Sequence, residues 1–184
     1  HYIDLMYFLT KAKPVKVLAT GQKNYLKKND LNTYDSIQCL IEWKLPSGKK
    51  FTQSILTNWI DPNNTTAMSD QKIKIIGTKG RIESDQKNRG MQYISDNQHL
   101  TQPNPDFCYP YKNIDNSNMS WKGYGIDSVS NFLKDVVSII NKEKTINNFN
   151  KSRSTFSDSI ISTAVIESAT KSLDKNSIWI KVKY

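Results

Sequence analysis

Cysteine, arginine and long apolar runs are scarce in this sequence of 184 residues. Only Cys39 and Cys108 are present, so we expect neither a disulfide framework nor a cysteine metal site, and we predict no bound metal. No apolar run approaches the roughly 18 to 20 residues of a membrane-spanning helix, and the first residues do not resemble a secretion signal. The sequence therefore predicts a soluble, cytoplasmic protein without a membrane partner.

The scarcity of arginine also argues against a nucleic-acid partner, although the formal net charge is +9. Arginine is the side chain best suited to read base edges and grip phosphates, and the sequence has only Arg81, Arg89 and Arg153. The lysines are spread from Lys11 to Lys183, as on a solvated surface. We therefore predict no nucleic-acid partner; an acidic partner domain is a second explanation of the charge.

What is present is enough apolar material for one globular domain, since 37% of the residues are hydrophobic. We predict a single domain over residues 1–184. Apolar periodicity predicts a helix over His1 to Leu9 that Pro14 terminates, followed by strands near residues 15–20, 37–43, 51–59, 72–76, 81–83 and 91–95. From Gln98 to Lys122, three prolines among Asn and Asp residues predict a long loop, and such loops are commonly functional.

Helical spacing returns in the last third of the chain. It predicts one helix over residues 126–140, capped by Asp127 or Ser128, and a second helix that starts near Ser154 or Thr155. The apolar face of the second helix is predicted to contain Phe156, Ile160, Ala164, Ser168 and Leu173. The alternation from Ile178 to Tyr184 predicts a final strand.

Strands followed by helices predict an α+β fold, with a mostly antiparallel sheet and helices packed on one face. The opposite face of the sheet is then open, and it carries large apolar side chains. A face of this kind rarely stays bare, so we predict that it meets another domain or a second subunit, making the protein a homo-oligomer through the open sheet face.

Several segments, taken in order, resemble the C-terminal domain of Gfo/Idh/MocA oxidoreductases, the family of inositol dehydrogenase and glucose-fructose oxidoreductase. The first residues, His1 to Leu5, resemble the end of an Asp-x-x-x-His-x-x-Asp motif, and Ile75 to Ile82 resembles the strand-turn-strand that follows in the family. The start of the first long helix, Gly123 to Ser128, is similar as well. The closing helix and strand are matched by Thr155 to Asp158 and Trp179 to Val182.

The resemblance implies a fold like the C-terminal domain of glyceraldehyde-3-phosphate dehydrogenase. It also implies a parent dehydrogenase that acts on a CH–OH group of a sugar, sugar acid or inositol. In that family an N-terminal Rossmann domain binds NAD or NADP, and this chain has no Gly-x-Gly-x-x-Gly stretch, since Gly77 to Gly80 is too short. We therefore expect the nucleotide domain to be absent from this chain and the chain alone to be inactive. The alternative is a non-catalytic interaction or oligomerisation module.

By the same resemblance His1 is the catalytic acid/base, because an imidazole with a pKa near 6.5 suits removal of a hydroxyl proton. An ordinary terminal residue is the alternative. Candidate substrate-binding residues flank the open face or the long loop: Trp59, Arg89 and Tyr124. Their rings can stack on a polyol or sugar-like substrate, and the guanidinium can bind a carboxylate or phosphate. A structural role is the alternative for each of the three.

Overall fold

The computed structural model describes residues 1–67, 69–112, 118–150 and 152–184. The chain divides into two compact units: unit 1 comprises residues 1–61 and 149–184, and unit 2 comprises residues 62–148. Unit 1 contains α1 (Tyr2–Thr10), β1 (Lys13–Gln22), α2 (Tyr25–Lys28), β2 (Ser36–Lys44), β3 (Lys50–Asn58), α5 (Phe156–Asp174) and β10 (Ile180–Lys181). Each unit is described by itself below.

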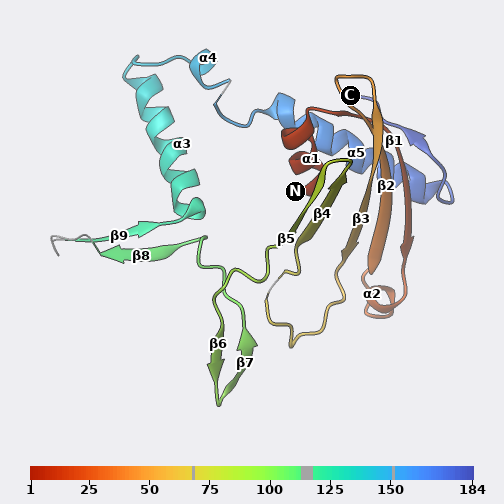
Figure 1. Cartoon of the computed structure of the whole chain (residues 1–184), viewed down its shortest axis with the longest axis horizontal. Coiled ribbons are helices and arrows are strands. Elements are labelled where there is room, and N and C mark those ends of the chain that lie inside the picture. Colours follow the sequence, from red (N-terminus) through yellow and green to blue (C-terminus); the bar gives the residue numbers. More distant parts are fainter. Residues whose placement is uncertain (68, 113–117, 151) are drawn as a thin grey trace. The chain divides into compact units, whose positions relative to one another are not determined.

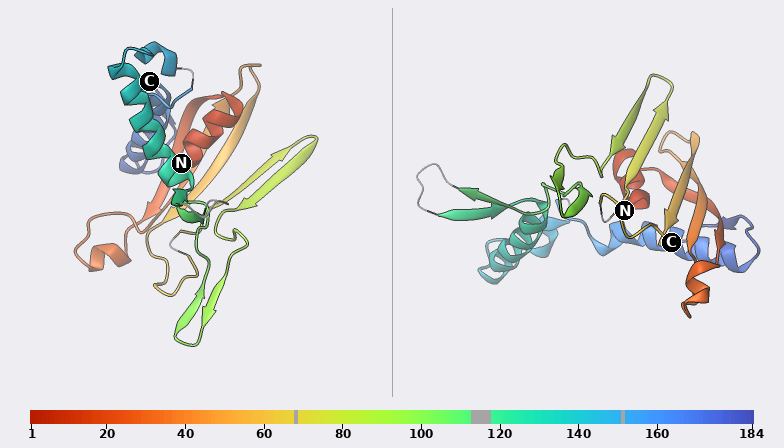
Figure 2. Two further views of the ribbon diagram at one scale, coloured as in Figure 1. Left: turned by 90° about the vertical axis from the view of Figure 1, so that its left-hand side faces the viewer. Right: turned by 90° about the horizontal axis from the view of Figure 1, so that it is seen from below.

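Unit 1 is a four-stranded antiparallel sheet with the strand order β10-β1-β2-β3. Within this unit α1 and α5 lie against the same face of the sheet (Figure 1), and the views in Figure 2 agree. No helix among the described residues of unit 1 lies on the other face, and β3 and β10 form the two edges of the sheet. The predicted α+β class, with an open-faced antiparallel sheet, is confirmed.

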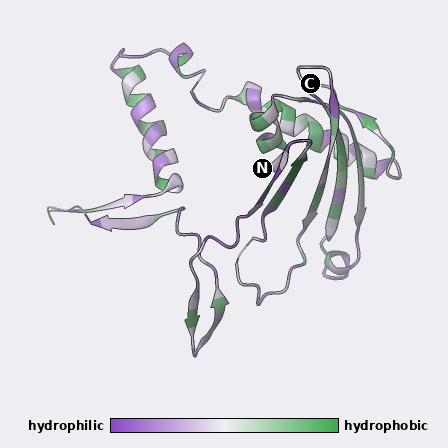
Figure 3. Cartoon of the chain, viewed as in Figure 1, coloured by the Kyte–Doolittle hydropathy of each residue, from purple (hydrophilic) through white to green (hydrophobic). Residues whose placement is uncertain are grey.

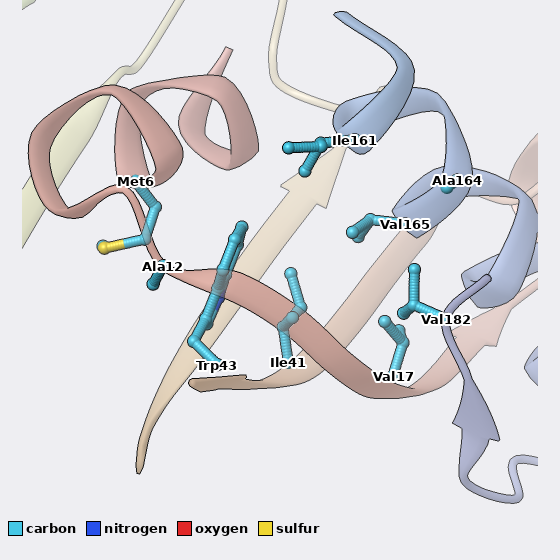
Figure 4. Close-up of a cluster of buried hydrophobic side chains, with 9 residues drawn as sticks. All are labelled: Met6, Ala12, Val17, Ile41, Trp43, Ile161, Ala164, Val165 and Val182. Atoms are coloured by element: carbon cyan, nitrogen blue, oxygen red, sulfur yellow. The ribbon is translucent and has the colours of Figure 1, made fainter. Parts of the chain in front are cut away.

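Strict alternation in the strands positions the core of unit 1. Val17 of β1 pairs with Ile41 of β2, and Trp43 of β2 pairs with Phe51 of β3, so all four project from the helix-covered face. Trp43 also stacks on Phe51, with ring centroids 6.2 Å apart. The core joins the sheet to both helices (Figure 4), and its buried members are Met6, Ala12, Val17, Ile41, Trp43, Ile161, Ala164, Val165 and Val182.

Helix α5 begins where the sequence predicts, because Thr155 and Asp158 form a capping box. The Thr155 hydroxyl accepts the Asp158 N–H, and the Asp158 carboxylate accepts the Thr155 N–H. The predicted buried face is only partly right, since Phe156 is 97% exposed and Ile160 is 51% exposed. The stripe that packs on the sheet starts at Ile161 and consists of Ile161, Ala164, Val165, Ser168 and Ser172.

Several ends and short elements of unit 1 differ from prediction. Helix α1 stops at Thr10, before Pro14, because Lys11 adopts a left-handed conformation with φ 53° while its N–H bonds to the Tyr7 carbonyl. Pro14 instead lies inside β1, where a register shift accommodates it. The short helix α2 was not predicted, and the last strand shrinks to β10, Ile180–Lys181.

Unit 2 contains three separate two-stranded hairpins. They are formed by β4 (Lys72–Gly77) with β5 (Gly80–Asp85), β6 (Tyr93–Ser95) with β7 (Gln98–Thr101), and β8 (Tyr109–Lys112) with β9 (Met119–Lys122). The prediction of a long loop over 98–122 is therefore wrong. Aromatic residues favour strands, and Tyr109 and Tyr111 alternate around Pro110, which is tolerated in a two-stranded hairpin. Residues 113–117 of that segment lie outside the described chain.

The hairpins lead into α3 (Tyr124–Ile140), and α4 (Ile146–Phe149) follows at the boundary of the unit. Helix α3 starts after Gly123 without a side-chain cap, so the predicted cap at Asp127 or Ser128 is wrong. Its first N–H groups bond instead to backbone carbonyls of an earlier segment. Apolar and polar positions alternate along α3 (Figure 3), and none of its residues is buried. No helix in the described part of the chain has the length and apolar character needed to cross a membrane.

Candidate functional site

The candidate acid/base His1 stands at the exposed start of α1. Its backbone carbonyl accepts the Leu5 N–H at 2.8 Å, so His1 is the N-cap residue of the helix. Asp4 lies in the first helical turn, where a carboxylate stabilises the positive end of the helix dipole. The structure therefore fixes the backbone of His1 and keeps this residue accessible to solvent.

A buried glutamine anchors the start of α1, and sequence reasoning missed it. The Trp43 indole N–H donates to Gln53 Oε1 at 3.0 Å, and Gln53 Nε2 donates to the Tyr2 carbonyl at 3.0 Å. Gln53 is only 9% exposed. The signal was a polar residue on the apolar side of β3, between Phe51 and Ile55. Its two bonds tie the residue next to His1 to the centre of the sheet.

Trp59 follows β3 and is 82% exposed, so its ring faces solvent within unit 1. Its backbone N–H donates to the Asp35 carbonyl at 2.9 Å. Asp35 is itself 1% exposed, and its carboxylate accepts three backbone N–H groups at 2.7 to 2.8 Å, from Asn24, Tyr25 and Leu26. The position of Trp59 thus depends on a buried carboxylate that no sequence pattern indicated.

These N–H groups hold the pKa of Asp35 below its usual value. The Leu26 N–H has the largest effect; burial acts in the opposite direction, and Tyr25 and Asn24 lower the pKa further. The carboxylate of Asp35 is therefore charged at neutral pH and shapes the loop between β1 and β2.

The other two candidates, Arg89 and Tyr124, belong to one cluster in unit 2. We call it the loop–helix junction: residues 104–107 docked on residues 123–125, together with Arg89. Arg89 Nη1 lies 2.9 Å from Asp106 Oδ2, and Arg89 Nε donates to the Gln86 carbonyl at 2.8 Å. Asn104 Nδ2 donates to the Tyr124 hydroxyl at 2.7 Å. Arg89 and Tyr124 are thus linked through one short segment.

Two glycines make the close docking of the junction feasible. The Tyr124 N–H donates to the Asp106 carbonyl and the Gly125 N–H to the Phe107 carbonyl, both at 3.0 Å. Gly123 has φ +124°, and a Cβ there would lie 2.6 Å from the Phe107 carbonyl oxygen. The rings of Phe107 and Tyr124 meet edge to face with centroids 5.4 Å apart. The Tyr124 ring is therefore held by both its backbone and its neighbour.

The described residues also bear on cofactors and metals. No group of three His, Cys, Asp or Glu side chains able to hold a metal ion occurs in the described ranges. The glycine-rich turn Gly77 to Gly80 joins the antiparallel strands β4 and β5, whereas a dinucleotide-binding turn joins a strand to a helix. The residues present do not fit a dinucleotide site of that type.

An open-faced antiparallel sheet backed by helices, followed by hairpins and a further helix, defines an α+β domain. The family model described as "Oxidoreductase family, C-terminal alpha/beta domain" matches residues 1–182. The chain belongs to the Gfo/Idh/MocA oxidoreductase family, and the resemblance seen in the sequence is confirmed.

Solved structures agree with this fold at low sequence identity. An oxidoreductase from Sinorhizobium meliloti is 14% identical with a TM-score of 0.59, and the match covers 97% of this chain and 49% of that one. The myo-inositol 2-dehydrogenase from Lactobacillus plantarum is 12% identical with a TM-score of 0.52, covering 100% of this chain and 46% of that one. The chain thus spans about half the length of either structure. No curated protein matches the chain significantly.

Proposed function

We propose that this chain is the substrate-side C-terminal domain of an NAD- or NADP-dependent dehydrogenase acting on a CH–OH group of a sugar, sugar acid or inositol. The observation that carries the proposal is the family match over residues 1–182, in a chain about half as long as its structural relatives. A Rossmann domain outside these residues would hold the nucleotide, and the chain alone would then be inactive.

His1 would act on the proton of the substrate hydroxyl. Oxidation of an alcohol carbon needs that proton removed, and a neutral imidazole accepts it near neutral pH. The nucleotide, when bound, supplies the redox chemistry. The other candidates are proposed each within its own unit: in unit 2, Tyr124 and Arg89 offer hydrogen-bonding groups at the loop–helix junction, and in unit 1, Trp59 offers an exposed ring for stacking.

Replacement of His1 in the full-length protein tests the assignment. We expect His1→Ala to lower kcat by about 100-fold or more, as for loss of a general base, with nucleotide affinity unchanged. His99→Ala is the matched control, because His99 is the other histidine of the chain and lies in the exposed hairpin β6–β7. Equal turnover of the two variants would remove His1 from the mechanism.

A titration of the chain with NADH and NADPH, followed by fluorescence, tests where the nucleotide binds. We expect no binding at micromolar concentrations, because the dinucleotide fingerprint is lacking. Micromolar affinity of this chain for NADH or NADPH would refute the proposal that a separate Rossmann domain binds the nucleotide.

The open sheet face supports an interface as well, and it favours the alternative of an oligomerisation module. Leu18 and Leu40 are cross-strand partners on this face, and Leu40 and Leu56 are 40% and 67% exposed. Near them Glu42 pairs with Lys16 at 3.6 Å and with Lys50 at 2.8 Å. We propose that two copies meet through this face and bury these leucines.

Sedimentation velocity on the chain checks the interface. We expect a dimer that Leu56→Glu converts to monomer, because a charge buried in an apolar interface is left without a partner. Ile166→Glu is the control, since Ile166 is 58% exposed on α5, away from the open face. A wild-type monomer, or a dimer that survives Leu56→Glu, would contradict the proposed interface.

A further inference from the structure

Helix α1 has one buried residue along its described length, Met6 in the middle of the helix. A helix of nine residues is marginal in water without tertiary contacts. Met6 belongs to the same buried cluster as Trp43 (Figure 4), whereas Phe8 and Leu9 near the end of α1 are 67% and 53% exposed. The first turn of α1 therefore depends on other contacts to keep it on the sheet.

Gln53 supplies such a contact, and the chemistry of its two partners fixes the direction of its amide. The indole N–H of Trp43 can only donate a hydrogen bond, and the carbonyl of Tyr2 can only accept one. Gln53 Oε1 therefore faces the indole at 3.0 Å, and Gln53 Nε2 faces the carbonyl at 3.0 Å. Trp43 is fully buried and Gln53 is 9% exposed, so water has little access to this bridge.

The bridge ends on the residue that follows His1. The Cα atoms of adjacent residues lie about 3.8 Å apart across a planar peptide, so the Tyr2 anchor restricts the place of the His1 backbone. The His1 carbonyl accepts the Leu5 N–H at 2.8 Å, which holds the peptide between His1 and Tyr2 in the helix. The His1 side chain makes no capping bond to α1, so capping does not occupy the imidazole.

We propose that Gln53 is a positioning residue, which acts through the start of α1 to hold His1 within reach of the substrate hydroxyl. The inference rests on the proposed function, in which His1 accepts the hydroxyl proton. Proton transfer needs the two heavy atoms at hydrogen-bond distance, and a displacement of about 1 Å can cost about 100-fold in rate. Trp43 acts one step further back, because its indole N–H sets the direction of the Gln53 amide.

A double-mutant cycle in the full-length protein tests whether Gln53 acts through His1. Gln53→Met keeps the length of the side chain and removes both hydrogen bonds. We expect it to lower kcat by between about 10- and 100-fold, with nucleotide affinity unchanged. In a His1→Ala background the same substitution should lower kcat by less than about twofold, because the group that Gln53 positions is gone.

Two further variants complete the cycle. Trp43→Phe retains the ring and removes only the indole N–H, and we expect a fall in kcat of about threefold that also vanishes in the His1→Ala background. It takes the place of Gln53→Met in the cycle if that variant does not fold. Ser172→Ala is the matched control, because the buried Ser172 hydroxyl also joins a helix to the sheet of unit 1, at α5, where it accepts the Ala19 N–H. Its kcat should stay within about twofold of wild type.

Hydrogen–deuterium exchange of the full-length protein, followed by mass spectrometry, gives a readout that does not depend on activity. We expect Gln53→Met to speed exchange in the peptide of residues 1–10 by about tenfold, because the start of α1 opens more often. Exchange in the peptide of residues 156–174, which forms α5, should be unchanged. Ser172→Ala should have the opposite pattern, with faster exchange in α5 and wild-type exchange in α1.

Two results would overturn this inference and leave the proposed function standing. One is an equal loss of kcat from Gln53→Met with and without His1, and the other is exchange in residues 1–10 at the wild-type rate, each together with a low kcat of His1→Ala. Full turnover by His1→Ala would overturn the proposed role of His1 and, with it, the role of Gln53. Loss of kcat only where His1 is present, with faster exchange in α1, would support the inference.

Discussion

Units 1 and 2 differ in how their elements are packed. Unit 1 buries nine hydrophobic side chains between a four-stranded sheet and two helices. In unit 2, Gly123 is the one buried residue among those that the structure describes. Isolated two-stranded hairpins are marginally stable in water, and unit 2 has three of them. The difference indicates that stabilising free energy is concentrated in unit 1, whereas unit 2 contributes the polar loop–helix junction.

The strongest test of this contrast compares two tryptophans. Trp43 is fully buried and Trp121 of β9 is 55% exposed. We expect Trp43→Ala to lower the free energy of unfolding by about 3–5 kcal/mol, because it leaves a cavity and an unpaired Gln53. Trp121→Ala should cost less than about 1 kcal/mol. Urea denaturation followed by circular dichroism measures both, and equal losses would abolish the contrast.

A smaller effect is expected where α5 is bonded to the sheet. The buried Ser172 hydroxyl accepts the Ala19 N–H at 2.9 Å and donates to the Ile178 carbonyl at 2.5 Å. Ser172→Ala leaves both backbone groups unpaired, and we expect a loss of about 1–3 kcal/mol in urea denaturation. Ser159→Ala on the exposed side of α5 serves as control, and a loss no greater than in this control would show that the bond contributes nothing.

The capping box of α5 should contribute less again. Thr155→Ala removes the side-chain acceptor of the Asp158 N–H, and we expect a loss of about 1 kcal/mol. Thr155→Ser retains the hydroxyl and should restore most of it. If the serine variant is as unstable as the alanine variant, the hydrogen bond is not the cause.

The last effect is expected when the wild-type protein is taken to acid pH. The pKa of Asp35 is lowered in the folded protein. Its contribution to the free energy of unfolding is therefore complete above its pKa in the unfolded chain, about 4, and is lost as the pH falls through its pKa in the folded protein. We expect the amide signals of Asn24, Tyr25 and Leu26 to move together in NMR spectra below about pH 4. Asp35→Asn should abolish this movement; its persistence would assign the titration to another group.

Local patterns predicted what depends on neighbours in sequence. The strands near residues 37–43 and 51–59 and the helix start near Thr155 were predicted from such patterns, and the structure has each of them. The hairpin β8–β9 was missed because Pro110 outweighed the alternation of Tyr109 and Tyr111. The proline predicted a loop and the alternating tyrosines predicted a strand, and the structure has the strand because it pairs with β9.

The contacts of the candidate site were beyond prediction because they join distant residues. Asp106 pairs with Arg89 across 17 positions, and Gln53 reaches the Tyr2 carbonyl across 51. Neither contact leaves a periodic trace in the sequence. The prediction that Arg89 can bind a carboxylate or phosphate rested on its place in the sequence and did not include its ion pair with Asp106. The roles of His1, Trp59, Arg89 and Tyr124 stay predictions for the experiments above.

The outer edge of β3 has a practical consequence for work with the chain. Nine residues, Lys50 to Asn58, pair with β2 on one side only in the sheet of unit 1. Unpaired backbone N–H and C=O groups along such a strand can template further strands from other molecules. Only Lys50 at one end bears a charge that discourages this. Concentrated preparations of the isolated chain should therefore tend to aggregate edge to edge, and a lysine in place of Thr52 or Ser54 would be the first change to improve solubility.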